Sequence, residues 1–151
     1  MSLRDWLDSR WIVRHDPDPA EVAELFGVVT RDLQDAAVPR LSADWRLGIA
    51  YNAALQLATM ALVAEGYRTG RERAHERTIQ SLRYTVGIPQ ARIDLVDAVR
   101  RKRNLINYEH AGTTSDSEAA EFHSAVIALR GDVIDWLRRK HRVLLPPDID
   151  I

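Results

Sequence analysis

The sequence contains no cysteine. This absence excludes disulfide bonds, thiolate zinc sites and cysteine nucleophiles, and it fits a reducing compartment. No export signal is visible either, because the opening residues MSLRDWLDSRW carry charges and tryptophans where a secretory signal has an apolar core. We therefore expect a cytoplasmic protein.

Long apolar runs and an excess of charge of one sign are also missing. The longest nearly apolar stretch, Ala53 to Ala64, is interrupted by Gln56 and Thr59 and falls short of the roughly 20 residues that a membrane helix needs. A soluble protein without a membrane segment is expected. The net charge is −1, so no overall field attracts nucleic acid, and any site for a polyanion must be local.

Familiar cofactor and catalytic motifs are absent as well. The sequence has no glycine-rich phosphate loop and no Ser-His-Asp signature. No two of its histidines have the spacing of metal ligands. We expect neither a metal nor a cofactor.

What the sequence does have is helical periodicity, punctuated by proline and glycine. A chain of 151 residues is the usual size of one domain, so 1–151 is taken as a single domain with a core over about 18–141. Residues 1–17 form a short helix or turn whose aromatic residues dock on the body, and 142–151 form a tail. A loop is expected at Tyr67 to Gly70. The expected helices run from Pro19 to before Pro39, from Ser42 to Gly66, from the end of that loop to Val86, from Pro89 to near Gly112, and from about Ser117 to His141. These elements predict an all-α fold, a four- or five-helix up-and-down bundle.

The stretch RRKRNLINYEHAG, at the end of the fourth long block, carries an unusual group of polar residues. Arg103 and His110 are seven residues apart and so share one face of a helix. Val96, Val99 and Ile106 lie close to the same line, which places the arginine in an apolar stripe. A charge there must be paired, must reach outward, or must lie beside a groove at an interface.

The same stretch resembles the HEPN superfamily of all-helical proteins. The family motif is an arginine, commonly followed by a polar residue, and then a histidine after four to six residues. Here Arg103 and Asn104 are followed by Tyr108 after four intervening residues and His110 after six. AYNAALQLATMALVAEGYR (50–68), then His75 and TIQSL, is similar to the second and third helices of the family. One departure is that a common active version has the histidine before the tyrosine.

The resemblance implies a homodimer that acts as a metal-independent endoribonuclease or RNA-binding component of a toxin–antitoxin or defence system. Arg103 would stabilise the phosphate and His110 would act as the base, with Asn104 and Tyr108 positioning them. Histidine titrates near pH 6.5 and suits the activation of a 2′-hydroxyl, and the planar fork of arginine suits a phosphate. The alternative is a catalytically inactive module that binds an antitoxin or a nucleotidyltransferase.

Simpler structural roles stay open for each of these residues. Arg103 would pair with a carboxylate on a neighbouring helix, for which Asp94, Asp97 and Glu118 are the candidates. His110 would favour the helix end through its positive charge. Tyr108 would be a core aromatic, Asn104 and Asn107 would cap or bridge helices, and His75 would orient the start of a helix. The second basic run, Arg138 to Arg142, is expected to be a solvated helix end.

Overall fold

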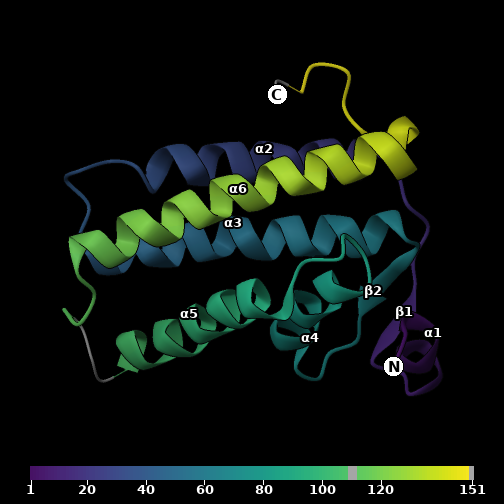
Figure 1. The fold of residues 1–151 in the computed structure, drawn as a ribbon, viewed down its shortest axis with the longest axis horizontal. Helices are drawn as coiled ribbons and strands as arrows, with labels where there is room; N and C mark the ends of the chain where they lie inside the picture. The colour runs from purple at the N-terminus through teal and green to yellow at the C-terminus, as the bar shows by residue number, and fades with distance from the viewer. Residues whose placement is uncertain (109–111, 150–151) are drawn as a thin grey trace.

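Six helices and one small antiparallel sheet make up the part of the chain that the computed structural model describes, residues 1–108 and 112–149, without the side chains of 105–108 (Figure 1). The helices are α1 Leu3–Asp8, α2 Pro19–Asp35, α3 Ala43–Ala64, α4 Ala74–Gln80, α5 Gln90–Tyr108 and α6 Asp116–Lys140. The strands are β1 Ile12–Arg14 and β2 Tyr67–Thr69, and short 3₁₀ helices span Ser81–Arg83 and Arg142–Leu144. The expected all-α class is confirmed.

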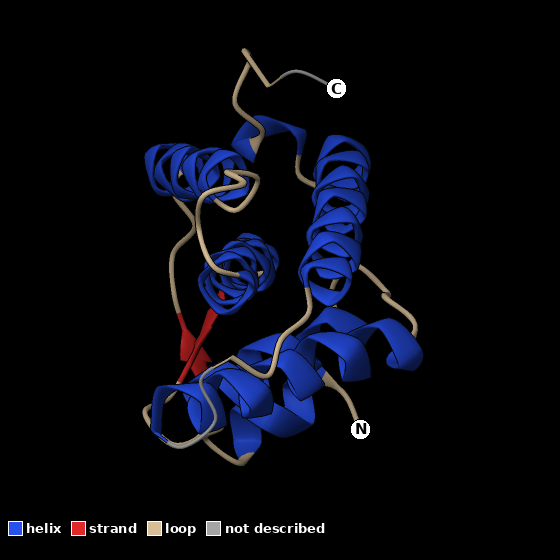
Figure 2. Ribbon diagram, turned by 90° about the vertical axis from the view of Figure 1, so that its left-hand side faces the viewer, coloured by secondary structure: helices blue, strands red, loops and turns tan. Residues whose placement is uncertain are grey.

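Helix α3 lies in the middle of the bundle. Helices α2 and α6 flank it on one side, and α4 and α5 cover the other, as the view along the bundle shows (Figure 2). The chain runs along α2, back along α3, forward again along α5 and back along α6, which is the expected up-and-down order. Large side chains of α3 such as Tyr51, Leu57 and Met60 are completely buried. The core therefore surrounds α3 on nearly every side.

Side-chain caps set the starts of three long helices. The Asp18 carboxylate accepts the Ala20 N–H at 2.9 Å, and Pro19 follows in the first turn. The Ser42 hydroxyl accepts the Trp45 N–H at 3.2 Å, and that of Ser115 accepts the Glu118 N–H at 3.0 Å. These bonds satisfy N–H groups that a helix start leaves without a partner. The starts expected at Asp18 with Pro19 and at Ser42 are confirmed.

The expected loop at 67–70 is wrong for its first three residues. Tyr67–Thr69 forms β2, which pairs with β1 so that Ile12 faces Thr69 and Arg14 faces Tyr67. The strand is too short to show an alternating pattern, and its partner lies far away in the sequence, so local periodicity could not reveal it.

The helix end expected at Val86 is also wrong, because α4 ends at Gln80. The Ser81 hydroxyl donates to the Thr78 carbonyl at 2.6 Å, and the Thr85 hydroxyl donates to the Ser81 carbonyl at 3.3 Å. Such side-chain bonds compete with regular helix, and the chain tightens into the 3₁₀ turn. Gly87 then adopts the left-handed backbone with φ +82°, as its place after a helical segment predicted.

The N-terminal segment docks on the bundle through a small cluster of its own. Trp6 and Ile12 are buried together with Leu62 of α3. The Trp6 ring lies edge-on to Trp11 and to Tyr84, with ring centroids 5.5 Å apart in both pairs. The expected docking of this segment is confirmed for these residues.

Helix α3 is long and apolar enough to cross a membrane by length and composition alone, but 72% of its most apolar window is buried inside the structure. That burial is typical of the core helix of a soluble protein. The apolar part of the helix is longer than its stretch 53–64 alone indicates.

Candidate functional site

Arg103 lies across α3 instead of reaching into bulk solvent. Its guanidinium carbon is 5.4 Å from the centroid of the Tyr51 ring, a cation–π contact. Gly48, one turn earlier on α3, leaves the space that the arginine side chain uses, because a Cβ added there would lie 3.7 Å from Arg103 Nε. The guanidinium thus lies on an aromatic face, and Arg103 passes close to the backbone of α3 at Gly48.

The carboxylates that a structural role would need are engaged by other side chains. Each of the three candidates has its own partner, Asp94 with Gln90, Asp97 with Arg100 and Glu118 with Lys102. Among the described residues, no carboxylate forms an ion pair with Arg103. Within residues 1–108 and 112–149, this half-buried arginine therefore has no acidic acceptor for its donors.

Tyr51 forms the floor beneath Arg103. It is completely buried, and its hydroxyl has no hydrogen-bond partner among the described residues. Burial raises the pKa of Tyr51 to about 12, against the opposing effect of the positive charges of Arg100 and Arg103. The phenol therefore remains neutral at physiological pH and offers its ring face to the cation.

A second imidazole reaches the same tyrosine from α4. The His75 ring centroid lies 6.5 Å from that of Tyr51, and the side chain is exposed. Desolvation by the surrounding protein lowers the pKa of His75, and the positive charges of Arg103 and Arg100 lower it further. At neutral pH the ring is uncharged and is able to accept a proton.

Arg100 completes this group, one turn before Arg103 on α5. Its Nε donates to Asp97 Oδ1 at 2.8 Å, and this bond raises the pKa of Arg100, so the guanidinium stays charged. We call Tyr51, His75, Arg100 and Arg103 the Arg103 cluster. The cluster brings together side chains of α3, α4 and α5 around the Tyr51 ring. Within the described part of the chain, Arg103 has no carboxylate partner, Arg100 is paired with Asp97, and the His75 imidazole is neutral.

The remaining predicted site residues are described only in part. Asn104 follows Arg103 on α5 and is exposed. Tyr108 is the last residue of α5, and its side chain lies outside the described part. His110 lies outside the described residues, and the expected pairing of Arg103 with His110 is not described. Of the apolar stripe, Val96 and Val99 are buried as predicted, while the side chain of Ile106 lies outside the described part.

Sequence reasoning missed Tyr51 and gave His75 a structural role. Both fall in the region that carries the family resemblance, which is the only signal that pointed to them. Helical spacing relates residues of one helix to each other, and it could not show that α5 would lie against Tyr51 of α3 and His75 of α4.

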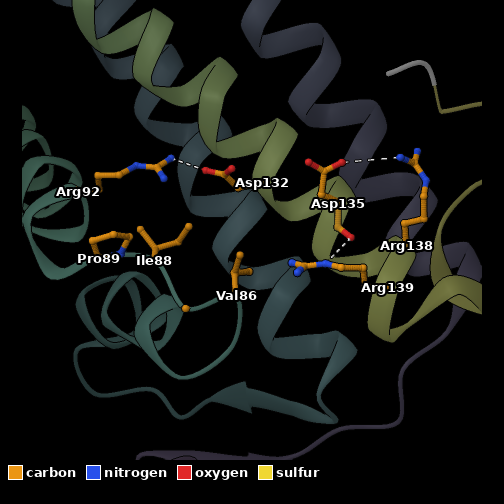
Figure 3. Close-up of a pocket in the computed structure, with 9 residues that line it drawn as sticks. Val86, Ile88, Pro89, Arg92, Asp132, Asp135, Arg138 and Arg139 are labelled. Carbon is orange, nitrogen blue, oxygen red and sulfur yellow. Dashed lines mark hydrogen bonds and ion pairs between the residues drawn. The ribbon is translucent and has the colours of Figure 1, made fainter.

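A wide cavity lined by described residues lies apart from this cluster and shares no lining residue with it. It has a volume of about 530 Å³ and is open to solvent between the turn at Gly87 and α6 (Figure 3). Its arginines are engaged, since Arg92 pairs with Asp132 at 2.6 Å and Arg138 lies 3.7 Å from Asp135. Arg139 donates to the Asp135 carbonyl at 3.3 Å. Ion pairs therefore neutralise most of the charge around this cavity.

Together the fold and the cluster define an all-α bundle protein with a small cationic site on its central helix. Comparison of the chain with protein-family models, with curated proteins and with solved structures finds no match.

Proposed function

We propose that this protein is a HEPN-like, metal-independent endoribonuclease that acts as a cytoplasmic dimer in a toxin–antitoxin or defence system. The observation that carries the proposal is the guanidinium of Arg103. It is oriented by Tyr51, has no carboxylate partner among the described residues and lies next to a neutral imidazole. The resemblance of the sequence around Arg103 to the HEPN motif supports the same assignment.

The chemistry requires one base and one fixed cation. The base removes the proton from the 2′-hydroxyl of RNA, and that oxygen attacks the adjacent phosphorus. The bond from phosphorus to the 5′-oxygen breaks, the leaving oxygen takes up a proton, and a 2′,3′-cyclic phosphate remains. Arg103 donates hydrogen bonds to the phosphate oxygens as negative charge develops on them. DNA is not cleaved because it lacks the nucleophile.

Two histidines compete for the role of base. His110 follows from the motif, with Asn104 and Tyr108 positioning the groups around it. His75 follows from the contact of its ring with Tyr51, on which Arg103 also lies. For His75, desolvation and the charges of Arg103 and Arg100 lower the pKa below its ordinary value, which favours the uncharged form that a base needs.

The test is incubation of the pure protein with RNA in EDTA. Arg103→Ala is expected to lower the cleavage rate by a factor of about 100 or more, as loss of a group that stabilises transition-state charge does. Either His110→Ala or His75→Ala should cause a comparable loss and so identify the base. Arg101→Ala is the matched control, because Arg101 lies on the same helix with an exposed side chain near Asp97. Full activity in Arg103→Ala, or none in the wild type, contradicts the proposal.

Dimerisation is tested separately by analytical ultracentrifugation. A HEPN-like dimer would sediment with twice the chain mass of 17.2 kDa. Such a dimer would bring two copies of Arg103 and His110 to one groove. A monomer at all concentrations would remove that part of the proposal and leave the single-chain cluster as the site to be tested.

One observation favours the alternative of an inactive interaction module. A cavity of about 200 Å³ with a mainly apolar lining lies between α5 and α6, where Leu95 is 47% exposed beside Val99 and Phe122. An exposed apolar groove between helices suits a partner such as an antitoxin or a nucleotidyltransferase. In that case the wild type would leave RNA intact, and Arg103→Ala would change no activity.

A further inference from the structure

A third cavity lies beside the Arg103 cluster, and it has the size and lining of a site for one small polar ring. It has a volume of about 230 Å³ and lies where α3, β2 and α4 meet. Pockets for drug-sized molecules measure roughly 300–1,000 Å³, so this one holds a single ring system and not a whole nucleotide. His75 lines the cavity and also contacts Tyr51, which connects the cavity to Arg103.

The walls of this cavity combine apolar surface with hydrogen-bonding groups, most of which are uncharged. Leu55 and Leu62 of α3 are buried and present carbon atoms to the cavity. The polar lining comes from Gln56 and Thr59 of α3, Thr69 of β2 and Thr78 of α4, and from Arg68 of β2, whose charge is paired with Glu21 at 3.3 Å. No carboxylate lines the cavity among the described residues. This lining suits an uncharged heteroaromatic ring better than a cation.

Internal hydrogen bonds hold several of these polar groups in place. The Thr59 hydroxyl donates to the Leu55 carbonyl at 2.8 Å, so its oxygen remains an acceptor. The hydroxyls of Thr69 and Thr78 bond to each other at 3.0 Å, which leaves one of the two protons to donate elsewhere. Both a donor and acceptors are therefore available for the edge of a ring.

Gln56 is held by a chain of bonds that reaches across to α2. Its amide nitrogen donates to Asn52 Oδ1 at 3.4 Å, and Asn52 in turn donates to the buried Asp32 carboxylate at 2.7 Å. The Gln56 carbonyl oxygen can still accept a hydrogen bond from a ligand. An amide fixed in this way is suited to reading the edge of a base.

We infer that this cavity, called here the α3–α4 pocket, binds one unpaired nucleobase of single-stranded RNA whose neighbouring phosphate lies on Arg103. The inference rests on the proposed function and adds the form of the substrate. A base enters such a pocket only when it is unstacked, and for this reason proteins recognise bases mainly in single-stranded RNA. Duplex RNA, whose bases are stacked and paired, is excluded.

The experiment measures binding of fluorescent single-stranded hexamers by anisotropy, with adenosine, uridine or cytidine as the base. The hexamers carry 2′-O-methyl groups, which block the nucleophilic oxygen and prevent cleavage. Ala74→Leu fills the pocket from the first turn of α4, where Ala74 lines it. Ala91→Leu is the matched control, because Ala91 is exposed near the start of α5.

Filling the pocket should weaken binding of at least one hexamer about tenfold, since the excluded base no longer contributes its contacts with the pocket. Ala91→Leu should bind like the wild type. An abasic hexamer and a duplex of the same length should bind the wild type more weakly and should not distinguish it from Ala74→Leu. Arg103→Ala should weaken the normal and the abasic hexamers together.

The outcomes separate the two proposals. The base-binding proposal is contradicted if Arg103→Ala weakens binding but Ala74→Leu does not. It is also contradicted if Ala91→Leu weakens binding as much as Ala74→Leu does. In both cases the proposed function stands. If the wild type binds no hexamer, the base-binding proposal is contradicted, and the proposed function is decided separately by the cleavage assay in EDTA. Circular dichroism checks the fold, and should Ala74→Leu not fold, Thr59→Val removes one of the polar groups and is expected to weaken binding in the same direction.

Discussion

At the scale of single residues, Tyr51 combines complete burial with a hydroxyl that has no partner among the described residues. A buried group without a partner lacks the hydrogen bonds that water gives it in the unfolded chain. Tyr51→Phe is therefore expected to leave the free energy of unfolding unchanged or to raise it by up to about 1 kcal/mol. Urea denaturation measures this change. A decrease of more than about 1 kcal/mol in the free energy of unfolding would show that the hydroxyl makes a stabilising hydrogen bond.

His75 gives a second prediction at this scale. Since desolvation and the charges of Arg103 and Arg100 lower the pKa of His75, NMR titration should place it below the ordinary value of about 6.5. Arg103→Met removes one of these charges and should raise the pKa toward 6.5. His123 serves as the control, because it is bonded to the Leu33 carbonyl and lies outside the cluster. A pKa of His75 at or above 6.5 would contradict the electrostatic account.

The same shift fixes the sign of a pH dependence. The folded protein binds a proton at His75 less readily than the unfolded chain does, so stability falls as the pH drops from about 6.5 toward the folded pKa. Above the unfolded pKa both states are neutral and the contribution vanishes. His75→Gln should therefore lose less stability than the wild type between pH 7 and pH 5 in urea denaturation. An equal loss in both would mean that the exposed ring is fully screened by solvent.

At the scale of elements, Gly48 shows how α3 and α5 share the site. A Cβ at this position would lie 3.7 Å from Arg103 Nε, an ordinary contact distance. Gly48→Ala should therefore stabilise the protein by about 0.5–1 kcal/mol, as alanine does in a helix interior, and should keep RNA cleavage. Gly48→Leu should displace the guanidinium and lower cleavage. Gly131→Leu is the control, since nothing lies within 4 Å of the Cβ it would add. Unchanged cleavage in Gly48→Leu would show that the place of Arg103 on α3 does not matter.

Some helix and strand boundaries can be predicted from the local sequence and others cannot. The starts at Pro19 and Ala43 were predictable because Asp18 and Ser42 cap them through bonds to the following turn. Strand β2 and the early end of α4 were not predictable. The first depends on pairing with a distant segment, and the second depends on hydroxyl bonds of Ser81 and Thr85 that periodicity does not report.

At the scale of the whole molecule, the site is a product of packing around α3. The spacing of RRKRN on one helix pointed to Arg103, and the family resemblance pointed to the region of Tyr51 and His75. That Arg103 would lie on Tyr51 depends on how α5 packs against α3, and no pattern within one helix encodes that. The α3–α4 pocket depends in addition on the β1–β2 pairing, because Arg68 and Thr69 of β2 line it.

The overall charge gives the last prediction. Because the net charge is −1, the protein has no general attraction for RNA, and the salt dependence of binding reports local phosphate contacts only. Among the described residues, the Arg103 cluster offers one cation without a carboxylate partner and one paired cation, which corresponds to one or two phosphates. The slope of log K against log salt for single-stranded RNA should then lie between about −0.7 and −1.4, and Arg103→Ala should reduce its magnitude by about 0.7. Arg101→Ala should change it less, because Arg101 is exposed and lies near Asp97. A slope steeper than about −3 would mean that RNA contacts a broad basic surface outside the cluster, and Arg103 would then be one phosphate contact among several instead of the centre of the site.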